Sequence, residues 1–205
     1  MNFIVFVISL LALSACGQNR NDETMRLSRE KYEEAKKQFD SSFIAQFPAG
    51  LQSRYFSITN CQAAEYNNVG LYLFEQELPD IFLDSLDSEL QRKSIATYES
   101  SDTCLFVISH RLREEENQDK FKHVNYNCIG SKLPIPYFKN DGISTACGLK
   151  EGFDLYIIEA KPGLFFKQYD LIPDSRMPEN GQNGYSRGIA INKQSKAIVY
   201  WSVIW

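Results

Sequence analysis

The sequence predicts an α+β fold, in which a mainly antiparallel sheet carries a long N-terminal amphipathic helix on one face. Apolar residues recur at helical spacing from residue 24 to about residue 46, and eight later segments alternate with a period near two. Most gaps between those segments are too short for the crossover helix that parallel neighbours need. Residues 24–205 have the usual size of one domain, so we expect a single α+β domain there.

The predicted N-terminal helix has one aromatic face. Charged side chains fill its other side, and Pro48 and Gly50 end it. The residues at helical spacing are Tyr32, Ala35, Phe39, Phe43 and Phe47. In a chain with one domain, such a face usually packs on a sheet.

The predicted strands are rich in β-branched and aromatic residues. They comprise residues 54–59, 69–75, 94–98, 104–110, 121–128, 153–160, 188–191 and 196–205. A shorter helix is expected at residues 81–93, where leucines follow helical spacing and Pro79 lies near the start. Ser202 is the only polar residue between Ile198 and Trp205. The last strand is therefore predicted to be central and covered on both faces.

Charge excludes some classes of partner. The formal net charge is −4 and no charged residue precedes Arg20, so the part after the first 15 residues is mildly acidic. Without a basic block, binding to nucleic acid or to anionic lipid by charge is not expected. The only histidines are His110 and His123. If residues 104–110 and 121–128 pair as a hairpin with Cys104 opposite Cys128, the two histidines fall on opposite faces, so no metal site is predicted. No cofactor is predicted either.

The first 16 residues resemble a known export signal. Residues 3–13 form an apolar run interrupted only by Ser9, and the run leads into Leu13-Ser14-Ala15-Cys16. A transmembrane helix needs about 20 apolar residues, so this run is too short to span a bilayer. Leu-Ser-Ala-Cys resembles the lipobox of bacterial lipoproteins, in which the cysteine becomes the lipidated first residue of the mature protein.

This resemblance implies a location in the cell envelope. Residues 1–15 would be a signal peptide that is removed, and residues 16–23 would be a lipidated Cys16, carrying fatty acids such as palmitate, with a flexible tether. Gly17 follows the cysteine where the enterobacterial pattern places Asp in proteins kept out of the outer membrane. We therefore expect an outer-membrane anchor, with the domain facing the periplasm or the cell surface. An ordinary secretory signal or an uncleaved anchor is the alternative.

The other four cysteines predict two disulfides. An even number of cysteines in an oxidising compartment favours pairing, with buried free thiols as the alternative. A hairpin that sets apolar residues opposite each other also places Cys104 opposite Cys128. The predicted pairs are therefore Cys104–Cys128 and Cys61–Cys147.

The segment Gly184 to Gly188 matches G-x-S-x-G, the nucleophile elbow of α/β-hydrolases. Its context does not fit, because a strand follows instead of a helix and no histidine comes after it. We expect the glycines to allow a tight entry into a strand.

A long loop rich in proline, glycine and asparagine, residues 173–185, is a candidate binding segment. Its hydrogen-bond donors and aromatic face, with one flanking arginine, suit a polar ligand or a partner protein; these residues are Arg176, Asn180, Asn183, Tyr185 and Arg187. A connector without a role is the alternative.

The sequence favours a lipid-anchored binding or interaction module without a cofactor, for example an immunity- or inhibitor-like protein. Its partners would be the membrane, through the lipid, and another envelope protein or a polar ligand. An enzyme is not favoured. The alternative is an envelope hydrolase that uses carboxylates, which sequence cannot identify because acid pairs are defined by distance in space.

Overall fold

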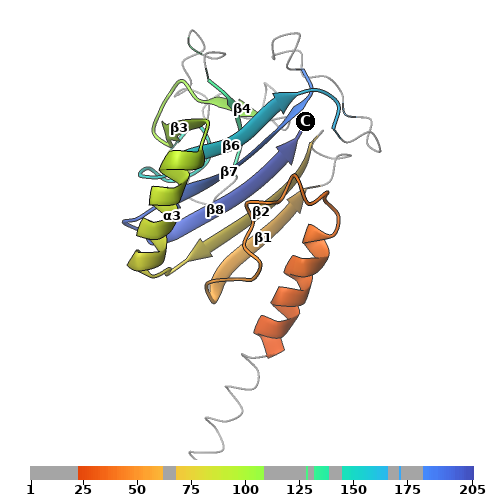
Figure 1. Ribbon diagram of the computed structural model, residues 1–205, viewed down its shortest axis with the longest axis vertical. Helices are drawn as coiled ribbons and strands as arrows, with labels where there is room; N and C mark the ends of the chain where they lie inside the picture. The colour runs from red at the N-terminus through yellow and green to blue at the C-terminus, as the bar shows by residue number, and fades with distance from the viewer. Residues whose placement is uncertain are drawn as a thin grey trace, which may run out of the picture. The chain divides into compact units, whose positions relative to one another are not determined.

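The computed structural model describes residues 23–61, 68–108, 128, 132–138, 145–165, 171 and 182–205 (Figure 1). The chain divides into two units, residues 1–38 and residues 39–205. In the first unit, residues 23–36 are helical. In the second unit, a mainly antiparallel sheet is combined with a helix, so the predicted α+β class is confirmed.

The predicted helix does not continue to residue 46. Residues 39–47 form turns, in which Ser42 donates its backbone N–H and its hydroxyl to Asp40 Oδ1. Phe43 N–H then donates to the Asp40 carbonyl at 3.0 Å, and Phe47 N–H to the Ile44 carbonyl at 2.9 Å. Aspartate and serine favour such local hydrogen bonds over helical ones. The predicted packing of the N-terminal helix on the sheet stays a prediction.

The main sheet has six strands in the order β1-β2-β8-β7-β6-β3, and each neighbouring pair is antiparallel. The strands are β1 (Tyr55–Cys61), β2 (Val69–Gln76), β3 (Ala96–Glu99), β6 (Asp154–Pro162), β7 (Gly184–Asn192) and β8 (Ala197–Ile204). A second, two-stranded sheet pairs β4 (Phe106–Ile108) in parallel with β5 (Pro134–Pro136). The predicted hairpin partner of β4, residues 121–127, lies outside the described residues.

The predicted second helix is confirmed as α3 (Asp80–Lys93), which lies in front of the sheet in Figure 1. Its buried residues are Leu83, Asp87 and Leu90, spaced so that they share one helical face. An acidic residue begins the helix and two basic residues end it, an arrangement that complements the helix dipole.

Strand β8 is central and covered on both sides, as predicted. Each of its residues is buried, and Trp205 directly after it is 2% exposed. One face of the sheet, with Trp201 and Val203, belongs to the main core, which β4 and β5 help to cover. The opposite face, with Tyr200, is covered by α3 and by residues 39–53.

Of the two glycines of the G-x-S-x-G segment, Gly184 begins β7, as expected, whereas Gly188 lies inside the strand. A Cβ atom at Gly188 would lie 2.3 Å from the Tyr156 carbonyl oxygen and 2.4 Å from Trp201 Cζ2. A Cβ atom at Gly184 would lie 2.6 Å from the Trp205 ring. The glycines are therefore needed because the two indole rings pack directly over the strand.

Candidate functional site

Three of the five candidate binding residues, Asn183, Tyr185 and Arg187, are described, and each of them contacts the protein itself. Asn183 Nδ2 donates to the Trp205 carbonyl at 3.3 Å. The buried Tyr185 ring packs edge-on against Phe43 and Phe165, with ring centroids 5.0 Å and 4.6 Å away. The other predicted residues, Arg176 and Asn180, lie outside the described residues.

Arg187 connects three elements instead of presenting a free donor. Its Nε donates to Glu159 Oε2 on β6 at 3.0 Å, and its Nη1 donates to Gln46 Oε1 at 3.1 Å. Gln46 in turn donates from Nε2 to the Trp201 carbonyl at 2.6 Å. Asn183, Tyr185 and Arg187 therefore make contacts within the protein, and Tyr185 and Arg187 connect residues 39–47 to the sheet. Their predicted role in binding a ligand or partner stays a prediction.

Glu159 is the negative centre of this group of residues. Hydrogen bonds from Lys161 and Tyr185, opposed by burial and assisted by Arg187, lower the pKa of Glu159 to about 2. Burial and the hydrogen bond to Glu159 raise the pKa of Tyr185. The carboxylate therefore stays ionised and the phenol stays neutral at neutral pH, as a permanent structural contact requires.

A second polar cluster lies beside α3 and is centred on Asp87. Tyr156 donates its hydroxyl to Asp87 Oδ1, while Lys193 Nζ and Gln91 Nε2 contact Oδ2 at 2.7 Å and 3.2 Å. Lys193 Nζ also lies 2.9 Å from Asp84 Oδ1. Asp87 is only 6% exposed, so it is not an ordinary solvated charge, although its acidic neighbours in the sequence suggest one.

The pKa values of Asp87 and its neighbour Asp154 are shifted in opposite directions. Burial opposes the ionised form of Asp87, but hydrogen bonds from Lys193 and Tyr156 outweigh it and lower the pKa. Burial, together with the negative charges of Asp87 and Glu99, raises the pKa of Asp154. Such a divergence is typical of acid–base pairs. Here both oxygens of Asp87 already accept hydrogen bonds from the chain, so the cluster is explained as a tie between α3 and the sheet.

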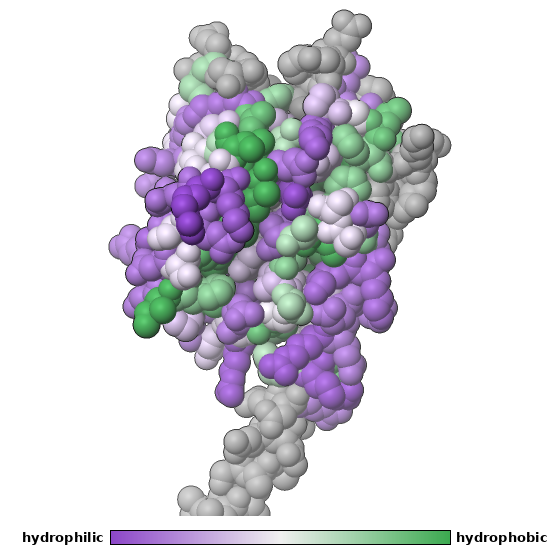
Figure 2. Space-filling model, in the orientation of Figure 1, coloured by the Kyte–Doolittle hydropathy of each residue, from purple (hydrophilic) through white to green (hydrophobic). Residues whose placement is uncertain are grey.

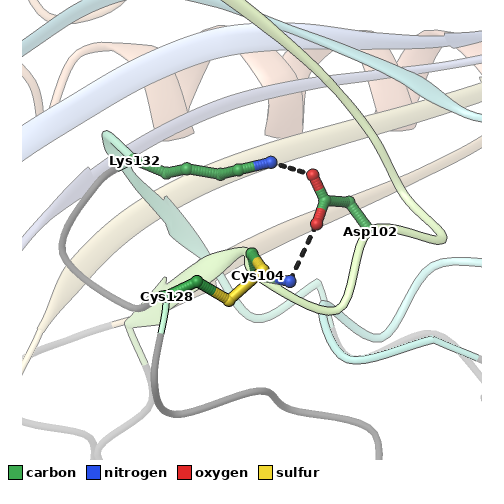
Figure 3. The surroundings of a disulfide bond; sticks show 4 residues. All are labelled: Asp102, Cys104, Cys128 and Lys132. Carbon is green, nitrogen blue, oxygen red and sulfur yellow. Dashed lines mark hydrogen bonds and ion pairs between the residues drawn. A yellow bond between two sulfur atoms is a disulfide. The ribbon is translucent and has the colours of Figure 1, made fainter.

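The predicted disulfide between Cys104 and Cys128 is confirmed, with Cα atoms 5.4 Å apart (Figure 3). Asp102 Oδ1 accepts the backbone N–H of Cys104 at 2.8 Å, and its Oδ2 pairs with Lys132. Lys132 Nζ also lies 4.7 Å from the centre of the Tyr98 ring. The disulfide is thus supported by contacts that reach β3.

The second predicted disulfide, Cys61–Cys147, does not form, because Cys147 is a free, buried thiol. Its Sγ lies 3.9 Å from the carbonyl oxygen of Ser100, directly after β3, whereas Cys61 ends β1 at the opposite edge of the sheet. Five strand spacings of about 4.8 Å separate those edges, and a disulfide needs Cα atoms within about 7 Å. Burial raises the pKa of the Cys147 thiol, which keeps it protonated.

No family model, curated protein or solved structure matches this chain. Among the described residues, no group of three or more His, Cys, Asp or Glu side chains is placed to hold a metal ion. His110 and His123 lie outside those residues. In the same part of the chain, no helix has the length and apolar character needed to cross a bilayer.

Proposed function

We propose that this chain is a lipid-anchored binding module of a bacterial cell envelope, attached to the outer membrane through Cys16. The lipobox-like Leu13-Ser14-Ala15-Cys16 supports the anchor. The Cys104–Cys128 disulfide supports an oxidising compartment, since structural disulfides are rare in the cytosol. As part of this proposal, the Tyr32 and Ala35 face of the N-terminal helix packs on the sheet, as its spacing predicts.

The anchor is tested by replacing the lipidated residue. In Cys16→Ala cells grown with radioactive palmitate, we expect no label in the protein and either an unprocessed precursor or a soluble product. The matched control is Cys61→Ala, which changes a cysteine outside the lipobox and should still be labelled. Label in the Cys16→Ala protein would disprove the anchor.

The observation that carries the binding role is the edge strand β1. Its sequence, Tyr-Phe-Ser-Ile-Thr-Asn-Cys, contains no charge and no proline, and its pairing with β2 has no bulge. Natural edge strands usually carry such features because an open edge pairs with other strands. The other edge strand, β3, is short and ends in Glu99.

We therefore propose that β1 receives an extended segment of another envelope protein, which adds a strand to the sheet. Exposed Tyr55, Ser57 and Thr59 would lie beside that segment. On the face that carries α3, hydrophobic side chains form separate groups among hydrophilic ones (Figure 2). On this face, the described side chains therefore do not form one broad apolar patch of the kind that marks a binding surface.

A pair of lysine substitutions tests this surface. The full-length protein, extracted from membranes in detergent, should capture a partner that Thr59→Lys loses, because a charge on an edge strand opposes pairing. Thr97→Lys is the matched control, since Thr97 is an exposed threonine on β3. A photo-crosslinker at position 57 should attach to the same partner. Equal capture by the two lysine variants would refute binding at β1.

The alternative function is an envelope hydrolase, and the opposite pKa shifts of Asp87 and Asp154 are the observation that favours it. Purified protein incubated with isolated cell-wall polymer decides between the two functions. Release of soluble fragments that Asp154→Asn abolishes would support the hydrolase.

A further inference from the structure

A buried carboxyl group in β2 has no role in the function proposed above. Glu75 is 0% exposed and lies between Phe56 on β1 and Ile198 on β8. Glutamate is almost never fully buried unless it is paired, because removing its charge from water costs several kcal/mol or more. The position of Glu75 among apolar side chains therefore needs an explanation.

The two oxygens of Glu75 have different surroundings. Oε1 accepts the backbone N–H groups of Gln52 and Ser53, at 2.6 Å and 3.0 Å. Oε2 is buried without a hydrogen-bond partner among the described residues. The donors lie in the segment that leads from the turns at residues 39–47 into β1. This segment is irregular, whereas the other neighbours of Glu75 are paired strands, so it is the part of the cover that moves most easily.

Among the described residues, no cation offsets the burial of Glu75. Burial raises its pKa, and the N–H groups of Ser53 and Gln52 are the opposing influences. The facing residues on β1 and β8, Phe56 and Ile198, are uncharged. The charge of Glu75 affects one titratable side chain on β8, Tyr200. Burial and the negative charge of Glu75 both raise the pKa of Tyr200.

We propose that Glu75 is a proton-controlled latch, which holds residues 50–53 over the sheet when it is protonated and loosens them when it is ionised. An ionised oxygen without a partner is stabilised only if water reaches it. Opening of residues 50–53 admits that water with the smallest loss of structure. The latch lies beside the first residues of β1, so its opening also changes the mobility of that edge.

The direction of the pH dependence follows from linkage. The pKa of Glu75 lies above its ordinary value of 4.5 in the closed form and returns toward that value when the segment opens. The closed form is therefore favoured fully below pH 4.5 and progressively less as the pH rises to the raised pKa, above which the effect levels off. Within this window the opening equilibrium increases up to about tenfold per pH unit.

Amide hydrogen exchange of the full-length protein in detergent, corrected for the intrinsic effect of pH, tests the latch. Protection of the Gln52 and Ser53 amides should fall with rising pH in the wild type and stay constant in Glu75→Gln. The matched control is Glu77→Gln, at an exposed position two residues away, which should behave like the wild type.

A second measurement keeps the test independent of how well the variant folds. The carboxyl ¹³C shift of Glu75 in the wild type gives the pH at which it titrates, and the loss of protection should level off at that pH. Protection that does not change with pH, that changes equally in Glu75→Gln, or that follows another midpoint would overturn the proposal.

Discussion

At the scale of single residues, the core depends on side chains whose partners are far away in sequence. Gly188 has no side chain because the Trp201 ring and the Tyr156 carbonyl occupy the space that a Cβ atom would need. Glu75 is buried because Gln52 and Ser53 cover it. The sequence draws attention to Gly188 through the G-x-S-x-G match but does not show its packing role, and a glutamate in an alternating pattern looks the same whether it is exposed or buried.

The close contact at Gly188 predicts a large effect of one methyl group. Gly188→Ala should lower the free energy of unfolding by about 1 to 3 kcal/mol, which is the usual cost of overpacking. The backbone carbonyl of Tyr156, 2.3 Å from the added Cβ atom, cannot rotate away as a side chain could. Denaturant unfolding measures this. Gly50→Ala is the control, because no atom lies within 4 Å of its added Cβ. Equal stability of the two variants would contradict the close packing.

At the scale of secondary structure, periodicity in the sequence predicts a helix or strand correctly where the residues at that spacing also pack on the core. Helix α3 and strand β8 match the expected segments because their apolar residues recur at the period of the element itself. Phe39, Phe43 and Phe47 also recur at helical spacing, yet they lie in turns. Phe43 contacts Tyr185 and Phe47 contacts Tyr200, so each of the two reaches the sheet without a helix.

The connection between α3 and the sheet gives a prediction for one hydroxyl group. Tyr156→Phe removes the donor to Asp87 Oδ1 and leaves the contacts of Oδ2 in place, and a hydrogen bond to a charged group contributes about 1.5 to 3 kcal/mol. We expect a loss of stability in that range, measured by denaturant unfolding at neutral pH. Tyr55→Phe removes a hydroxyl from a residue that is 57% exposed and should change stability by less than about 0.5 kcal/mol. Similar losses in both variants would show that the Asp87 contact contributes little.

At the scale of the whole molecule, the sheet order explains which parts of the candidate site were unpredictable. The sequence indicates an antiparallel sheet through its short connections, but it does not state that β2 lies beside β8. That pairing joins residues far apart in the chain and depends on the complete core. The charged contacts of Arg187 and Asp87 follow from the same arrangement, since their partners come from other elements. Loop length and composition therefore indicate a candidate binding segment, but they do not reveal the internal contacts that some of its residues make.

Strand β8 and Trp205 belong to the core, which predicts a large loss of stability when these residues are removed. Trp205 exchanges two backbone hydrogen bonds with Gly184, each 3.0 Å long, and its indole ring covers that glycine. Val203 is 1% exposed on the same face. Chain ends are ordinarily tolerant of trimming, so this arrangement distinguishes β8 from a tail.

Deleting Val203 to Trp205 should unfold or aggregate the protein. Replacing one core tryptophan by alanine already costs about 3 to 5 kcal/mol, out of a total stability of about 5 to 15 kcal/mol. Deleting residues 17–23, which precede the domain, removes more of the chain and should leave the melting temperature nearly unchanged. Thermal unfolding of the two truncated proteins compares them directly. A C-terminal deletion that melts like the wild type would mean that Trp205 is dispensable for the core, and that the burial of β8 does not determine the stability of the sheet.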